Sequence, residues 1–121
     1  MSRTTGARGE PATFYTRHRP VDDDVVVELG GEFDAGSLDE LTRVLGEVLA
    51  TEPREIVVDL AETTFVDSMT LGALTAAAKQ VRAGGGSFRI VRARAPEVRR
   101  AFEVTGLAGY LFDPAASSTA P

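Results

Sequence analysis

Two short segments of the chain carry the side chains that could do chemistry. The first runs Gly31-Glu32-Phe33-Asp34, and the second runs Phe65-Val66-Asp67-Ser68-Met69-Thr70-Leu71-Gly72. Each follows an apolar run typical of a buried strand and precedes a helical pattern, so we expect both at the carboxyl edge of a parallel sheet. Partners and ligands of open α/β sheets usually bind at that edge. Turn formation and helix capping explain the same residue types equally well.

The second segment predicts a helix start that could carry a phosphate switch. We expect Asp67 or Ser68 to be the N-cap, with the backbone N–H groups of the first turn facing whatever docks there. The hydroxyls of Ser68 and Thr70 are the phosphorylation candidates. A phosphate on either would be stabilised by the positive end of the helix dipole and would repel an acidic or apolar partner.

Composition excludes several classes of function. The chain has no cysteine and a single histidine, His18, so we predict no metal site, no cofactor and no catalytic triad. We therefore do not expect an enzyme. The net charge of −5 argues against direct binding to nucleic acid. Because no apolar run is long enough for a membrane span or a secretory signal, we expect a cytoplasmic protein.

Apolar periodicity predicts alternating strands and helices between two polar ends. Residues 1–12 and 114–121 are rich in small polar residues and proline, so we predict two disordered tails around one ordered domain, residues 13–113. The predicted strands are residues 13–19, 25–29, 56–60, 87–91 and 110–112. The predicted helices are residues 37–51, a segment from 71 to the glycines at 84–86, and residues 96–105.

This order of elements predicts the fold class. Strand, helix, strand, helix, strand with short connections indicates a single α/β domain with a mostly parallel sheet and helices packed against it. The turn at residues 20–24 makes the first two strands an antiparallel edge hairpin. Because the runs at 25–29, 56–60 and 87–91 are nearly continuously apolar, we expect these strands to be covered on both faces of the sheet.

Taken in order, the segments resemble the STAS domain, the family of anti-sigma factor antagonists and related modules. The resemblance covers residues 13–113. It is carried by Gly31-Glu32-Phe33-Asp34, by residues 56–60 with Phe65-Val66-Asp67-Ser68, by Leu71-Gly72, and by residues 96–107. It implies a single STAS-like domain that, when unphosphorylated, binds an anti-sigma factor, often a serine kinase, and so frees a sigma factor. Phosphorylation by that kinase breaks the complex, and a phosphatase resets the cycle.

The chain departs from the family pattern at Met69. In the family the loop reads Asp-Ser-Ser/Thr-Gly-Leu, and the phosphoacceptor is usually the hydroxyl residue two after the aspartate. Here Met69 occupies that position and has no hydroxyl, and Thr70 replaces the glycine. Three interpretations stay open: Ser68 or Thr70 accepts the phosphate instead, the protein is a permanently active antagonist, or it has another binding role.

The resemblance also implies a partner-binding surface around these segments. The predicted contact residues are Asp34, Asp67, Ser68, Met69, Leu71 and Gly72. The alternative function is a STAS scaffold subunit of a larger assembly, such as a stress-sensing complex or a lipid-transport apparatus. A nucleotide-binding domain is disfavoured, because the glycines at 84–86 lie at a helix end rather than a helix start.

Overall fold

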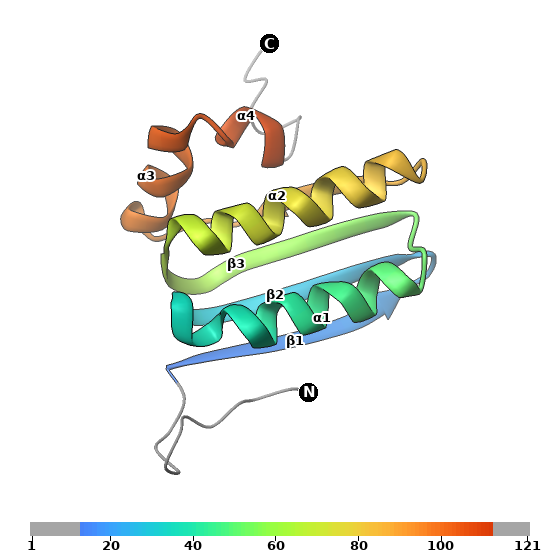
Figure 1. Cartoon of the computed structure of the whole chain (residues 1–121), viewed down its shortest axis with the longest axis horizontal. Coiled ribbons are helices and arrows are strands. Elements are labelled where there is room, and N and C mark those ends of the chain that lie inside the picture. The colour runs from blue at the N-terminus through green and yellow to red at the C-terminus, as the bar shows by residue number, and fades with distance from the viewer. Residues whose placement is uncertain (1–12, 113–121) are drawn as a thin grey trace.

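Four strands and the helices between them make up the described part of the chain, residues 13–112 of a computed structural model (Figure 1). The tails predicted at residues 1–12 and 114–121, and Asp113, lie outside the described residues. The elements in chain order are β1 Phe14–Val21, β2 Asp24–Phe33, the short 3₁₀ helix η2 Ala35–Ser37, α1 Leu38–Ala50, β3 Glu55–Val66, α2 Ser68–Ala83, β4 Ser87–Val91, α3 Pro96–Thr105 and α4 Ala108–Leu111.

The sheet has the predicted topology. Its strands lie in the order β1-β2-β3-β4, with β1 antiparallel to β2 and the two remaining pairs parallel. A tight turn at Asp22 and Asp23 joins β1 to β2, and Asp22 adopts a left-handed φ of 57°. Aspartate tolerates that conformation better than most residues with a side chain. The prediction of an α/β domain with a mostly parallel sheet and one antiparallel edge hairpin is confirmed.

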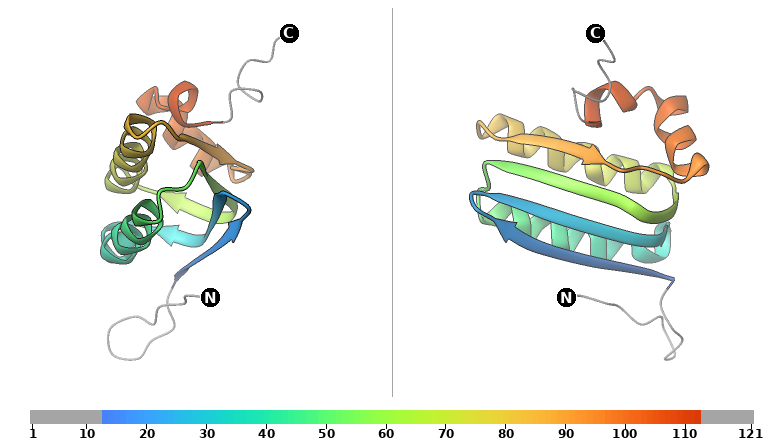
Figure 2. Two further views of the ribbon diagram at one scale, coloured as in Figure 1. Left: turned by 90° about the vertical axis from the view of Figure 1, so that its right-hand side faces the viewer. Right: turned by 180° about the vertical axis from the view of Figure 1, so that it is seen from behind.

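The core lies between one face of the sheet and the two long helices. Figure 2 shows α1 and α2 side by side against the same face, and alternate residues of the strands point toward them. From β2 to β4 these inward residues include Val27, Leu29, Val58, Leu60 and Ile90, each no more than 2% exposed. The helices meet them with the apolar stripe predicted from the spacing, which includes Leu41, Leu45, Leu71 and Leu74.

The opposite face of the sheet carries no long helix across its strands, as the view from behind shows (Figure 2). Cross-strand ion pairs lie there instead, joining Arg17 to Glu28 at 3.0 Å and Arg89 to Glu55 at 3.1 Å. The expectation of burial on both faces holds for residues 56–60, all of which are buried. It is wrong for β2 and β4, where the outward-facing Val26, Glu28 and Arg89 are only half-buried. These outward positions hold valine or charged residues that pair across strands, and the sequence alone does not show which charged residues are partners.

Asp59 has the most buried carboxylate of the ion pairs described on this open face. Its carboxylate accepts hydrogen bonds from Arg92 at 2.5 Å and from the backbone N–H of Ala61 at 2.9 Å. Burial alone would raise the pKa of Asp59, but these hydrogen bonds and the positive charge of Arg92 outweigh it and hold the pKa below its ordinary value. Arg92 makes this contact from a left-handed φ of 58° just past the end of β4.

Two central strands run further than the sequence predicts. β2 continues to Phe33 rather than ending at residue 29, and β3 continues to Val66 rather than ending at residue 60. The register of the β2–β3 pair shifts near Gly31, whose φ is 88°. In the extension Thr63 is buried and its hydroxyl donates to the carbonyl oxygen of Leu29 at 2.6 Å. Polar residues thus extend these strands through pairing that apolar periodicity does not reveal.

The last predicted strand, residues 110–112, is wrong. α3 ends at Gly106, which has a left-handed φ of 75°, and the chain then forms the short helix α4. Leu111 is fully buried, and Phe112 makes one isolated parallel bridge to Ile90 of β4. The aromatic and apolar residues at 110–112 therefore cover the end of the core as a helical turn. Among the described residues, no helix is long and apolar enough to cross a membrane.

Candidate partner-binding site

The sheet brings the two chemistry-bearing segments together at the carboxyl ends of neighbouring strands. Phe33 at the end of β2 pairs with Val66 at the end of β3, so the residues that follow, Asp34 and Asp67, lie at the same edge. The backbone N–H of Asp67 donates to the carbonyl oxygen of Phe33 at 3.0 Å, which continues the pairing past the end of β3. The expected location at the carboxyl edge of the sheet is confirmed in geometry.

Asp34 caps the turn that leads into α1. Its Oδ1 accepts from the backbone N–H of Gly36 at 2.9 Å, while its own backbone N–H donates to Oγ of Ser37 at 2.9 Å. The bond to Ser37 is one half of a capping box, in which the Asp34 side chain in turn accepts from the backbone N–H of Ser37. Asp34 itself remains exposed, so the cap does not remove it from the surface.

Asp67 is the N-cap of α2, and Thr70 completes the cap. Oδ1 of Asp67 accepts from the backbone N–H of Thr70 at 2.8 Å. The Thr70 hydroxyl lies 2.9 Å from the same Oδ1 and 3.1 Å from the carbonyl oxygen of Phe33, so its single proton can be donated to either acceptor. Thr70 is 0% exposed. The branched side chain that replaces glycine here therefore points inward and ties the helix start to the end of β2.

The first turn of α2 presents different side chains to the surface. Ser68 and Gly72 are exposed, and Met69 is 53% exposed. Ser68 makes no capping hydrogen bond, because the cap position belongs to Asp67. Leu71 is 3% exposed and lies in the core, so its side chain does not reach the surface on which we expected a partner contact.

Phe65 is an exposed residue that sequence reasoning did not assign to the site. It lies next to the end of β3 and is 43% exposed, although a large aromatic side chain would ordinarily be buried. Nothing in the sequence indicated this exposure. The strand was expected to end at residue 60, so the direction of the Phe65 side chain could not be inferred. We use the term junction surface for Asp34, Phe65, Ser68, Met69 and Gly72.

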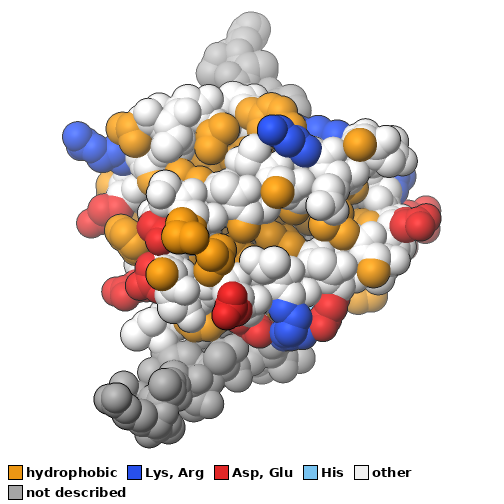
Figure 3. Space-filling model, viewed as in Figure 1, with side chains coloured by type: hydrophobic (Ala, Val, Ile, Leu, Met, Phe, Trp, Pro, Cys, Tyr) orange, Lys and Arg blue, Asp and Glu red, His pale blue; other side chains and the backbone are white. Residues whose placement is uncertain are grey.

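The junction surface combines apolar and acidic character. Figure 3 shows apolar side chains over the start of α2 with acidic side chains beside them on the same side of the molecule. Glu32 and Asp34 are exposed at the end of β2, and Asp67 is half-buried at the end of β3. Such a surface matches a partner that offers an apolar contact flanked by basic groups.

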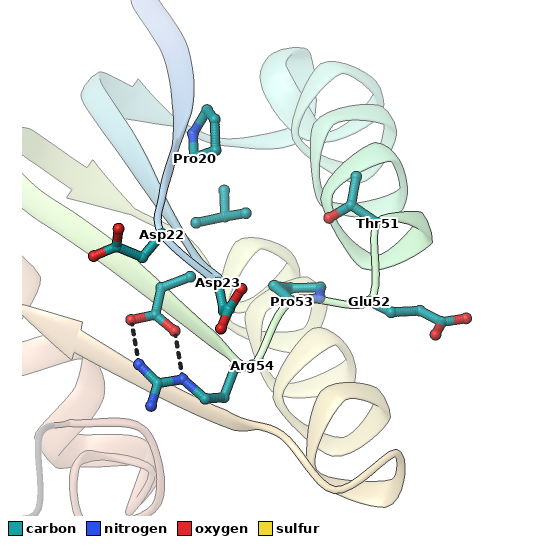
Figure 4. A pocket seen from close by; sticks show the side chains of 9 residues that line it. Pro20, Asp22, Asp23, Thr51, Glu52, Pro53 and Arg54 are labelled. Carbon is teal, nitrogen blue, oxygen red and sulfur yellow. Dashed lines mark hydrogen bonds and ion pairs between the residues drawn. The ribbon is translucent and has the colours of Figure 1, made fainter.

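A hollow lies at the opposite end of the sheet from the junction surface and holds none of the predicted site residues. It is formed by the β1–β2 turn and the α1–β3 connection, and Figure 4 shows Asp22 and Asp23 on the turn, while the Glu52 side chain extends away from them. The guanidinium of Arg54 binds the carboxylate of Asp24 through two hydrogen bonds of 3.1 Å. Within residues 13–112, no group of three histidine, cysteine or acidic residues is arranged to hold a metal ion.

Comparison with known families identifies the domain type. The family model of the STAS domain matches residues 15–119 of the chain. Among curated proteins, the anti-sigma-F factor antagonist RsfB of Mycobacterium tuberculosis is 34% identical over 83 residues, which are 68% of this chain and 66% of that protein. The match thus spans about two thirds of the length of the curated relative.

Solved structures show the same fold. A crystal structure of an anti-sigma factor antagonist from Mycobacterium paratuberculosis superposes with a TM-score of 0.74 at 32% identity, covering 81% of this chain and 82% of that one. The unphosphorylated form of the anti-sigma factor antagonist SpoIIAA superposes with a TM-score of 0.66 at 21% identity, covering 81% and 86%. The second likeness, at its lower identity, supports the fold alone.

Proposed function

The chain belongs to the STAS domain family, and we propose that it is an anti-sigma factor antagonist, a cytoplasmic regulatory protein that binds an anti-sigma factor and so releases a sigma factor. Two relatives above 30% identity carry that description. The exposed groups of the candidate site are carboxylates, a serine hydroxyl and apolar side chains, which suit binding rather than catalysis.

The junction surface is the observation that carries the proposal. Met69 exposes an apolar side chain at a helix start that Asp67 and Thr70 already hold in place, and Phe65 exposes one near the end of β3. An exposed methionine adapts its shape to an apolar partner surface, and aromatic residues are enriched in protein interfaces. The carboxylates of Glu32 and Asp34 flank these residues and favour a partner with basic groups around an apolar patch.

The geometry narrows the phosphorylation candidates of this proposal. Met69 offers no hydroxyl, and the hydroxyl of Thr70 is buried and hydrogen-bonded, so a kinase would have to unfold the cap to reach it. Ser68 is exposed and is the candidate that a kinase can reach. We therefore propose Ser68 as the residue on which a kinase-type anti-sigma factor, opposed by a phosphatase, would act.

A kinase assay tests this assignment. The chain is incubated with its bound anti-sigma factor and ATP, and peptide mass spectrometry locates any phosphate. We expect phosphate on Ser68 and none on Thr70. The variant Met69→Ser restores a hydroxyl at the family position and should gain a second phosphate there. Phosphate on Thr70 in the folded wild type would contradict the assignment.

Binding to anti-sigma factors of the same genome tests the function itself. We expect the full chain to bind at least one of them, measured by isothermal titration calorimetry. Met69→Asp should weaken that binding at least about tenfold, because it buries a charge in the apolar part of the interface. The substitution should leave α2 folded, since an acidic residue in the first turn of a helix is electrostatically favourable.

Val21→Asp is the matched control, because Val21 is also an exposed apolar residue but lies at the opposite end of the sheet. It should bind as tightly as the wild type. Absence of binding to every anti-sigma factor by a folded wild type would overturn the proposed function. If Val21→Asp and Met69→Asp weaken binding equally, the junction surface is not the binding site.

A further inference from the structure

Met69 is chemically distinct from every other exposed side chain of the domain. The chain has no cysteine and no tryptophan, and its only other methionine, Met1, lies outside the described residues. The thioether of Met69 is therefore the side chain within residues 13–112 that reacts most readily with a hydroperoxide. Susceptibility to oxidation follows exposure, and Met69 is 53% exposed.

We propose that Met69 is a reversible oxidation site that controls partner binding at the junction surface. In the reaction one oxygen atom passes from a hydroperoxide such as hydrogen peroxide to the sulfur of Met69. The O–O bond breaks and an S–O bond forms, so the sulfur loses two electrons, the peroxide is reduced, and water leaves. Methionine sulfoxide reductases return the sulfoxide to the thioether with electrons from a thiol reductant.

Because Met69 lies on the surface, its oxidation should leave the fold intact. Its side chain is absent from the hydrophobic core, whose nearest members in α2 are Leu71 and Leu74. The cap of α2 is made by Asp67 and Thr70 and uses no atom of the Met69 side chain. Oxidation therefore changes the chemistry of the surface while the helix start keeps its hydrogen bonds.

The same reaction changes what the junction surface can bind, and this step rests on the proposed function. The sulfoxide replaces a flexible apolar group with a polar S–O group. Burying that group in an interface without a hydrogen-bond donor carries a desolvation penalty, which weakens docking of an apolar partner surface. Oxidation of Met69 would thus release the partner. It would act at the same position in the chain where the STAS family pattern has a hydroxyl residue.

The first test follows the chemistry without any partner. The full chain is exposed to hydrogen peroxide, and peptide mass spectrometry follows the gain of one oxygen atom on the peptide that contains Met69. N-acetylmethionine amide in the same solution supplies the rate of a fully exposed thioether. We expect Met69 to react within about threefold of that rate, because its side chain is open to solvent. A rate more than about a hundredfold slower would overturn the proposal, whatever the chain binds.

The second test measures binding after the peroxide has been removed. The oxidised chain is titrated with the anti-sigma factor that binds the untreated wild type. We expect at least about a tenfold loss of affinity, with recovery after treatment with methionine sulfoxide reductases A and B and dithiothreitol. Circular dichroism should stay unchanged, since the cap and core are intact.

Met69→Leu is the control for this test, because leucine keeps the apolar surface but cannot be oxidised by peroxide. The affinity of the variant is measured before and after peroxide, and these two values should be equal, whatever the affinity of the untreated variant. An oxidised wild type that binds with unchanged affinity would overturn the proposal. So would an equal loss of binding by peroxide-treated Met69→Leu. A wild type that binds no anti-sigma factor before oxidation instead refutes the proposed function and leaves the reaction at Met69 to be judged by its rate.

Discussion

The hydrogen-bonded start of α2 allows a double-mutant test of how the site is held together. Oδ1 of Asp67 lies 2.8 Å from the backbone nitrogen of Thr70 and 2.9 Å from its hydroxyl oxygen. Asp67→Ala removes the acceptor. Thr70→Val removes the hydroxyl and keeps the shape of the side chain. If the hydroxyl donates to Asp67, the two substitutions remove one shared interaction and their effects cannot add.

The expected magnitudes follow from the contacts. Loss of the cap in Asp67→Ala should lower the free energy of unfolding by about 0.5–2 kcal/mol. Thr70→Val should lower it by about 1–2 kcal/mol, because the acceptor of the buried hydroxyl loses its donor. The carbonyl oxygen of Phe33 still accepts from the backbone N–H of Asp67. The double variant should lose less than the sum of the two by about 0.5–1.5 kcal/mol, the coupling typical of residues in contact.

Urea unfolding of the full chain, followed by circular dichroism, measures these free energies. Thr75→Val is the matched control, because the Thr75 hydroxyl donates to the carbonyl oxygen of Leu71 at 2.8 Å in the same helix. Combined with Asp67→Ala it should be additive within about 0.3–0.5 kcal/mol. If Asp67→Ala and Thr70→Val are also additive within that margin, the hydroxyl does not bond to Asp67 and the inference of a shared cap fails.

Two further predictions concern the sheet. Gly31→Ala should destabilise the domain by roughly 3 kcal/mol or more, because Gly31 has a φ of 88° and an added Cβ would overlap the carbonyl oxygen of Thr13. The control Gly46→Ala, which has open space around it in α1, should stabilise the domain by up to about 1 kcal/mol in the same urea titration. The pKa of Asp59 is lowered in the fold by its pairing with Arg92, so its stabilisation is present above the unfolded pKa of about 3.9 and is lost as pH falls through the folded pKa. Urea titrations across pH 2–5, a range of roughly three units around that value, should show a shallower acid loss for Asp59→Asn than for the wild type, and equal slopes would contradict the pairing.

Much of the fold could be predicted because its signals are local. The apolar spacing of α1 and α2 and the glycines and prolines at element ends lie in consecutive residues. Residue type limited the N-cap of α2 to Asp67 or Ser68, and the structure shows that it is Asp67. The outer parts of β2 and β3 could not be predicted in this way. They are polar and are held by pairing across the register shift at Gly31, which depends on residues far apart in the chain.

The candidate site shows the same division. Its place at the carboxyl edge follows from the order of strands and helices, and the missing hydroxyl at Met69 is visible in the sequence. The burial of Thr70 is not visible, because it depends on the carbonyl oxygen of Phe33 in the neighbouring strand. The exposure of Phe65 and the burial of Leu71 depend likewise on where β3 ends and how α2 turns toward the core.

The fixed start of α2 has a consequence for the speed of recognition. A loop that must order itself when a partner arrives gives up about 1–2 kcal/mol of backbone entropy for each residue that it immobilises. Here Asp67 and Thr70 are already ordered by hydrogen bonds to each other and to Phe33. If the proposed partner docks at this surface, no local folding step is needed there, so we expect association in a single phase whose rate depends on diffusion, orientation and charge.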